Sequence, residues 1–202
     1  MKLYDAGASG NCHKVRLFLS ILGLDYEAVP VNLAEGEQNT PEYLAMNPLH
    51  QVPVLDDAGF VLRDSQAILV YLARREGKDD WLPTDAKAMG EVMQWMIFSG
   101  NEMLHGCAVS RALIKFGREG DIPLAQSRAN AALAVLDGRL DKSDWLAFDR
   151  PTIADIANYP YAGMVWEGQV SLDPYPNVRA WLERVEALDG WVGMPGLAGI
   201  PV

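Results

Sequence analysis

The stretch QVPVLDDAGFVLRDSQAIL, residues 51–69, indicates the fold most directly. Two apolar runs flank the turn residues 57–59, a pattern that predicts a β-hairpin. The chain then enters SQAILVYLARREG, residues 65–77, whose apolar residues recur at helical spacing. Ser65 is the expected N-cap of this helix, and Gly77 is expected to lie just past its end. A hairpin that leads directly into an amphipathic helix is therefore the first prediction.

The residues before the hairpin predict a βαβ unit and a short helix. Residues 1–5 suit a short buried strand. The next apolar residues are spaced i, i+3, i+4 and i+7, as on one face of a helix: Val15, Phe18, Leu19 and Leu22. A second strand is predicted within residues 25–33, and a short helix over residues 41–47. Residues 1–77 thus predict the order β-α-β-α-β-β-α.

The residues after position 77 predict a different architecture. Residues 78–85 carry charges and a proline and are expected to form a linker. Residues 86–202 predict helices only, beginning with a long helix over residues 86–106. The end of the chain, from residue 189 on, is rich in glycine and proline and is expected to be loose. The predicted fold class is an α/β domain followed by an all-α domain.

Composition and charge exclude several classes of protein. The chain has 202 residues, half of them apolar, and its net charge of -10 argues against binding nucleic acid or an anionic membrane. The two cysteines, Cys12 and Cys107, do not form a secreted disulfide framework, and with three histidines they predict no metal site. Because no signal peptide and no run of 18 apolar residues is visible, a cytoplasmic protein without a membrane span is expected.

The motif SGNCHK, residues 9–14, reads Ser-x-x-Cys where a thiol redox protein has Cys-x-x-Cys. From these residues alone three interpretations stay open: a disabled redox motif, a different active site, or a loop that ends in a helix cap. Ser9 suits a turn or a cap, and Asn11 is an alternative N-cap of the first helix.

The predicted order of elements, taken with four motifs, resembles the cytosolic glutathione transferase superfamily over essentially the whole chain. The motifs are SGNCHKVR (9–16), NPLHQVPVL (47–55), RDSQAIL (63–69) and RPTIADI (150–156). The first motif is similar to the serine-type theta and zeta classes and to the bacterial nu-like class. The resemblance implies a thioredoxin-like N-terminal domain that binds glutathione, a helical domain that supplies most of a second-substrate pocket, and a homodimer.

The resemblance further implies that Ser9 stabilises the thiolate of glutathione at the start of a helix. Lowering a thiol pKa of roughly 8.5 by about two units requires roughly 2.7 kcal/mol, and a hydrogen bond to a charged group supplies about 1.5–3 kcal/mol. Asn11 is a second candidate donor to the sulfur. Cys12 is either a rival nucleophile, which would form a mixed disulfide with glutathione, or a small packing residue.

The other motifs imply contacts along the rest of glutathione. Members of the superfamily have a cis proline at the position of Pro53, which would let the backbone of Val52 pair with the cysteinyl part. Asp64 and Ser65 suit the ammonium and carboxylate groups of the γ-glutamyl end. Candidates for the glycine carboxylate or nearby backbone are Gln38, His50 and Gln51.

The helical domain contributes candidates of two kinds. Residues implied to line or border the second-substrate pocket are His105, Cys107, Arg111 and Trp166. Thr152 and Asp155 have the spacing of a capping box, which the superfamily uses to start its helical domain, so they are assigned to folding.

The sequence therefore predicts a glutathione transferase. Ser9, helped by Asn11, would stabilise the thiolate, and the thiolate would attack a small electrophile without any metal or organic cofactor besides the co-substrate glutathione. Three alternatives stay open: a glutathione-dependent disulfide reductase or peroxidase, a zeta-like cis–trans isomerase, and a non-catalytic binding module. The isomerase is weakened because residue 10 is glycine, where zeta enzymes carry a second serine.

Overall fold

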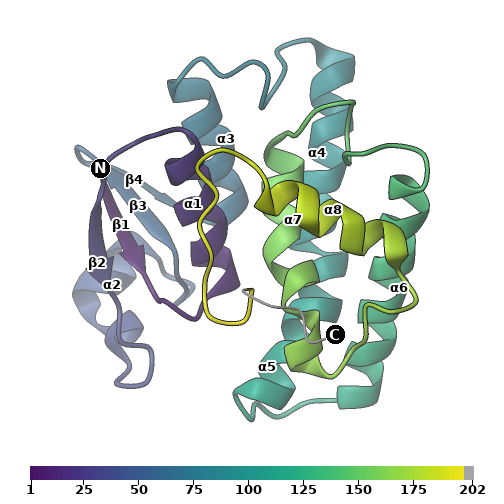
Figure 1. Cartoon of the computed structure of the whole chain (residues 1–202). Helices are drawn as coiled ribbons and strands as arrows, with labels where there is room; N and C mark the ends of the chain where they lie inside the picture. Colours follow the sequence, from purple (N-terminus) through teal and green to yellow (C-terminus); the bar gives the residue numbers. More distant parts are fainter. Residues whose placement is uncertain (198–202) are drawn as a thin grey trace.

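The computed structural model describes residues 1–197, in which a sheet with its helices lies beside a bundle of helices (Figure 1). The first part comprises β1 (Lys2–Asp5), α1 (Gly10–Ile21), β2 (Glu27–Pro30), the 3-10 turn η1 (Glu37–Asn39), α2 (Pro41–Met46), β3 (Val54–Asp57), β4 (Phe60–Arg63) and α3 (Ser65–Arg75). The predicted order β-α-β-α-β-β-α and the thioredoxin-like fold are confirmed.

The sheet has the strand order β2-β1-β3-β4, in which β1 is parallel to β2 and β3 is antiparallel to both β1 and β4. Ala58 and Gly59 form the tight turn of the hairpin, and both have positive φ values, 53° and 93°. Tyr4 of β1 pairs with Val54 of β3. This register places the residues that precede β3 beside the loop that follows β1.

The second part contains α4 (Ala86–Gly100), the π-helical turn η2 (Leu104–Ala108), α5 (Val109–Lys115), α6 (Ile122–Leu140), α7 (Ile153–Gly163), the 3-10 turn η3 (Val165–Gly168) and α8 (Pro176–Glu186). The prediction of one long helix over residues 86–106 is wrong, because α4 ends at Gly100 and the chain continues into η2. At Gly106 the backbone of η2 lies so close to α6 that a Cβ atom would stand 2.6 Å from the nitrogen of Ala129. Among the described residues no helix is both long and apolar enough to cross a bilayer.

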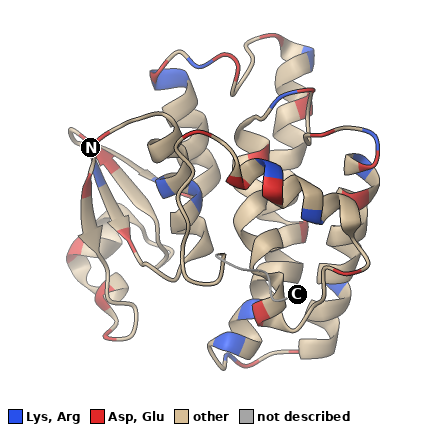
Figure 2. Ribbon diagram, viewed as in Figure 1, with Lys and Arg blue, Asp and Glu red and all other residues tan. Residues whose placement is uncertain are grey.

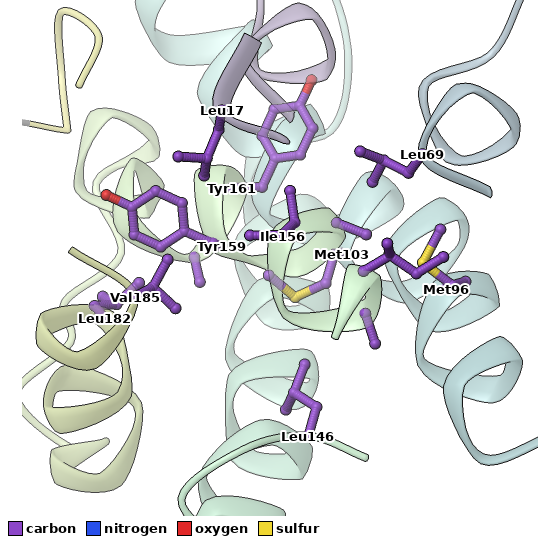
Figure 3. Packing of buried hydrophobic residues seen from close by; sticks show 14 of the residues in the cluster. Leu17, Leu69, Met96, Met103, Leu146, Ile156, Tyr159, Tyr161, Leu182 and Val185 are labelled. Carbon is purple, nitrogen blue, oxygen red and sulfur yellow. The ribbon is translucent and has the colours of Figure 1, made fainter. Parts of the chain in front are cut away.

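One hydrophobic core runs through both parts of the molecule (Figure 3). Helices α1 and α3 lie between the sheet and the bundle and pack against α7 (Figure 1). Leu17 of α1 is buried together with Ile156 and Tyr159 of α7. A smaller apolar cluster, which includes Cys12 and Val52, forms apart from this core. The two parts are therefore joined through shared packing.

The segment between α3 and α4 is held against the core. The ring of Trp81 lies 5.2 Å from that of Phe18, and Leu82 is buried. The carbonyl oxygen of Trp81 accepts a hydrogen bond from the backbone N–H of Ile153, at the start of α7. The division into a domain of residues 1–77, a linker and a domain of residues 86–202 stays a prediction.

The expectation of a loose chain from residue 189 on is wrong for residues 189–197. This segment runs alongside α1 (Figure 1), and a Cβ atom at Gly190 would lie 2.8 Å from the carbonyl oxygen of Ser20. Met194 and Leu197 are buried in the core. Burial of these apolar side chains thus outweighs the conformational freedom expected of a segment rich in glycine and proline. Residues 198–202 lie outside the described part of the chain.

Candidate functional site

The loop between β1 and α1 places the hydroxyl group of Ser9 at the start of a helix. Ser9 is the N-cap: its Oγ accepts a hydrogen bond from the backbone N–H of Cys12 at 3.3 Å, and its own N–H donates to the carbonyl of Ala6 at 2.9 Å. The alternative of Asn11 as N-cap is wrong. Capping uses a lone pair of Oγ, so the hydroxyl hydrogen remains free to be donated. Within residues 1–197 it has no acceptor.

The start of α1 lies directly against α7. A Cβ atom at Gly10 would lie 2.8 Å from the ring of Tyr161, so only glycine allows this approach. Asn11, the second residue of the helix, is half-buried and lines a surface hollow. The helical part of the molecule therefore helps to fix where Ser9 and Asn11 stand.

The surroundings of Cys12 oppose its candidacy as a nucleophile. Its side chain is fully buried, and burial raises the pKa of its thiol to about 12. The hydrogen bond with Ser9 lowers this pKa but does not offset burial, and the negative charge of Asp5 raises it further. The thiolate is the reactive form of cysteine, so the geometry favours a packing residue.

The hollow lies where the start of β3 and the start of α3 face the start of α1. Its lining is formed by Asn11, Asn47, Leu49, Gln51, Val52, Pro53, Arg63, Asp64 and Ser65. Six of these are candidates from the sequence: Asn11, Gln51, Val52, Pro53, Asp64 and Ser65. The bond between Val52 and Pro53 is cis. Among the described residues the backbone N–H and C=O of Val52 have no hydrogen-bonding partner.

The start of α3 corrects one prediction, because its N-cap is Asp64 and not Ser65. One carboxylate oxygen of Asp64, Oδ1, accepts from the backbone N–H groups of Gln66 at 2.9 Å and Ala67 at 3.1 Å. Asp64 has a φ of 76°, which is not helical, and the helix begins at Ser65, one residue earlier than an N-cap at Ser65 predicts. Ser65 is buried as the first helical residue.

Two further candidates are engaged with their own loop. Nε2 of Gln38 donates to the carbonyl oxygen of Leu33 at 3.4 Å. Nδ1 of His50 lies 2.8 Å from Oδ1 of Asn39. Neither Gln38 nor His50 lines the hollow as described. A role for them in binding glutathione stays a prediction.

Leu49, Asn47 and Arg63 line the hollow and Tyr43 supports it, but the sequence did not point to any of these four residues. Tyr43 and Asn47 both donate to the carbonyl oxygen of Gln51, at 2.8 Å and 2.7 Å, and so hold the segment that precedes Val52. Arg63 lines the hollow with an exposed side chain. Asn47 and Arg63 each begin a motif that was singled out in the sequence, but neither was considered as a ligand-binding residue.

The candidates for a second-substrate pocket lie in different surroundings. His105 is exposed in a groove between α4 and α6, whereas Cys107 is buried in the core. Arg111 is buried and pairs with Glu167. Trp166 is exposed on η3, and its Nε1 donates to the carbonyl of Gly196 at 3.0 Å. Their common role as a pocket lining stays a prediction.

A buried cation lies on α1, close to the hollow. The ammonium group of Lys14 donates to Oγ of Ser99 at 3.1 Å and lies 5.1 Å from the centre of the Tyr161 ring. Burial lowers the pKa of Lys14 to about 7, and the charge of Asp64 acts in the opposite direction. Burial also lowers the pKa of the neighbouring His13 to about 3. Elsewhere acidic and basic residues are interspersed along the ribbon (Figure 2).

A metal site is not apparent in the described part of the chain, where no group of three His, Cys, Asp or Glu residues is arranged to hold an ion.

A thioredoxin-like part joined to a helical bundle, with a hollow at the starts of α1 and α3, defines the class of protein. Residues 1–74 match the N-terminal domain of the glutathione S-transferases, and residues 102–189 match their C-terminal domain. The chain belongs to the glutathione S-transferase family.

Relatives come from several branches of the family. The chain is 34% identical to glutathione S-transferase D7 of Anopheles gambiae over 184 residues, which cover 90% of this chain and 84% of that protein. It is 32% identical to maleylacetoacetate isomerase of Pseudomonas aeruginosa, over 89% of this chain and 88% of that one. The crystal structure of a glutathione S-transferase from Pseudomonas fluorescens superposes with a TM-score of 0.90 at 33% identity, covering 96% and 98% of the two chains.

Proposed function

We propose that this member of the family is a glutathione transferase in which Ser9 stabilises the thiolate of bound glutathione. The observation that carries the proposal is the hydrogen bonding of Ser9. Its lone pair caps α1, which fixes the side chain, while its proton has no acceptor within the described residues. A donor that is already held in place loses little freedom when it binds an anion. The start of α1 adds a favourable dipole.

Glutathione would lie along the hollow. Asp64 uses Oδ1 for capping, which leaves Oδ2 for the ammonium group of the γ-glutamyl end. The backbone of Val52 supplies a free N–H and C=O for the cysteinyl part. Gln51 and Arg63 offer polar and basic groups for the carboxylates.

The reaction would join the glutathione sulfur to a small electrophile. The thiolate attacks an electron-poor carbon, a carbon–sulfur bond forms, and the electron pair of the broken bond leaves with the departing group or goes to an activated double bond. Glutathione serves as co-substrate, and no metal or organic cofactor takes part. A reducing compartment, the cytoplasm, suits a protein whose Cys12 and Cys107 are both free thiols.

A homodimer is the second part of the proposal. A groove of about 480 Å³ between α4 and α6 is partly apolar, and Val135 on its rim is 51% exposed. Glu102 and Arg128 line the same groove with opposite charges. In a two-fold dimer Glu102 of one copy would face Arg128 of the other, and the same pair would form a second time, which favours a self-complementary interface.

The alternative of disulfide or peroxide reduction through Cys12 is opposed by the burial and raised thiol pKa of that residue. Isomerisation with glutathione as a true catalyst is supported by the similarity to maleylacetoacetate isomerase. Both isomerase and transferase need the activated thiolate, so Ser9 has the same role in either reaction.

The test is a titration of the thiolate absorbance of bound glutathione between pH 5 and 9. We expect a thiol pKa well below about 8.5 in the wild type, and a rise of about 1–2 pKa units in Ser9→Ala, because one hydrogen bond to a charged sulfur is lost. Ser9→Thr keeps both the cap and the donor and should restore much of the effect.

Cys12→Ala is the matched control, since it changes the adjacent sulfur but leaves the Ser9 hydroxyl in place. We expect its bound glutathione to titrate as in the wild type. A Ser9→Ala variant with an unchanged pKa would contradict the role of Ser9. A wild type that does not bind glutathione would favour a non-catalytic binding module.

A further inference from the structure

Arg111 of α5 reaches from the helical part of the molecule to the loop that carries Ser9. Its Nη1 donates to the carbonyl oxygen of Ala8 at 3.0 Å, across 103 residues of sequence. Ala8 immediately precedes Ser9. A hydrogen bond at this carbonyl restrains the backbone from which the Ser9 side chain extends.

The guanidinium group of Arg111 is itself held tightly. Its Nε pairs with Oε2 of Glu167 on η3, and the other oxygen of that carboxylate pairs with Lys115. The ring of Phe116 lies 5.0 Å below the guanidinium carbon. The side chains of Arg111 and Glu167 are only 4% and 6% exposed, so their ion pair is shielded from water.

The backbone around Arg111 is fixed by close packing with η3. A Cβ atom at Gly168 would lie 2.5 Å from Oγ of Ser110 and 2.8 Å from the backbone nitrogen of Arg111. The backbones of α5 and η3 therefore approach so closely that only glycine fits at position 168. Glu167, the residue before this contact, faces Arg111. The Arg111 guanidinium group, which donates to Ala8, is thus held in a fixed position by the helical part of the molecule.

We propose that Arg111 is a positioning residue that sets the location of the Ser9 hydroxyl through the Ala8 carbonyl. The inference rests on the proposed role of Ser9. It gives the helical part of the molecule a direct influence on activation of the thiol, in addition to any contact with the second substrate. Arg111 has a planar fork, so its Nε binds Glu167 while its Nη1 binds Ala8. Lysine carries all its donors on one nitrogen and lacks this fixed spacing.

The decisive variant is Arg111→Lys, because it keeps the buried positive charge beside Glu167 but lacks the fork. We expect the pKa of bound glutathione to rise toward its value in Ser9→Ala, and kcat to fall about tenfold, as a small misplacement of a catalytic group commonly does. The KM for glutathione should stay within about twofold, because the contacts along the hollow are unchanged.

Lys115→Gln is the matched control. The substitution removes the positive charge that pairs with the Glu167 carboxylate, but residue 115 does not contact Ala8. We expect its thiol pKa and kcat to match the wild type. An equal shift in Lys115→Gln and Arg111→Lys would overturn the proposal in favour of a general effect of charge.

A folded Arg111→Lys variant with the wild-type thiol pKa also overturns the proposal; circular dichroism and thermal unfolding establish that the variant is folded. If Arg111→Lys does not fold, Ala8→Gly replaces it, because glycine gives the backbone at residue 8 more freedom. We then expect the thiol pKa of bound glutathione to rise in Ala8→Gly, and an unchanged pKa in that variant refutes the inference. Ser9→Ala measured in parallel separates the two claims. If only Ser9→Ala shifts the pKa, the positioning role fails and the role of Ser9 stands.

Discussion

Ser9 and Asp64 share one arrangement at the residue scale. Each is the N-cap of a helix whose start faces the hollow, and each uses only part of its hydrogen-bonding capacity for capping. Ser9 retains a proton and Asp64 retains one carboxylate oxygen. Capping orders a side chain before a ligand arrives, which reduces the entropy that is lost on binding. Capping and ligand binding are therefore compatible at both positions.

Asp64→Asn separates these two contributions, because asparagine caps helices as well as aspartate but carries no charge. We expect the Kd of glutathione to rise about tenfold through loss of a charged hydrogen bond, while the melting temperature changes little. Asp64→Ala should weaken binding similarly and also cost about 0.5–2 kcal/mol of stability. Titration calorimetry and thermal unfolding measure the two effects.

A glutathione analogue without its amino group provides the control for Asp64→Asn. The wild type should bind this analogue as weakly as Asp64→Asn binds glutathione, and the variant should not distinguish the two ligands. Equal losses in the wild type and the variant would show that Asp64 does not bind the ammonium group.

At the element scale, α1 carries polar residues on a face that is fully covered. His13 and Lys14 are both buried, since α7 packs along α1 and α4 supplies Ser99. Apolar spacing identified the helix but gave no sign that these two residues are buried. The sequence pattern of a single helix does not reveal that a second part of the chain covers its polar residues.

The depressed pKa of Lys14 predicts a dependence of stability on pH. The folded protein releases this proton near pH 7, whereas the unfolded chain holds it to about pH 10. Between these values the unfolded state binds more protons, so stability rises with pH. We expect Lys14 to add about 2 kcal/mol to the free energy of unfolding between pH 7 and pH 9.

Urea unfolding of wild type and Lys14→Met at pH 7, 8 and 9 tests this prediction. The Lys14→Met variant should lose most of this rise in stability, because methionine has no group that titrates and buries no charge at pH 7. Lys142→Met, at an exposed position, should keep the wild-type slope. A Lys14→Met variant with the same slope as the wild type would show that another group causes the pH dependence.

At the scale of the whole molecule, the groove between α4 and α6 bears on the proposed dimer. We expect Val135→Asp to raise the dissociation constant of the dimer at least about tenfold, since placing an unpaired charge in the interface costs more than about 1.4 kcal/mol. Sedimentation velocity over a range of concentrations measures this shift. Leu33→Asp, at an exposed apolar residue outside the groove, should leave the dimer intact. A wild type that is monomeric throughout contradicts the proposal.

Local patterns in the sequence predicted most of the architecture. The apolar spacing gave the order of elements through α3, and turn residues gave the hairpin. The capping box of Thr152 and Asp155 also forms as predicted, with a buried Asp155 that accepts from the backbone N–H of Leu146 as well. These features depend on residues that are near in sequence, so propensity and spacing suffice to find them.

The sequence by itself determined the fold class, the family resemblance and most of the residues that line the hollow, because each of these is written in short motifs. Only the tertiary structure decided that Cys12 and Lys14 are buried, that the chain near residue 190 lies along α1, and that Arg111 holds the loop before Ser9. Those outcomes depend on segments that are far apart in sequence and meet only when the core forms, and burial and hydrogen bonding then outweigh local preference.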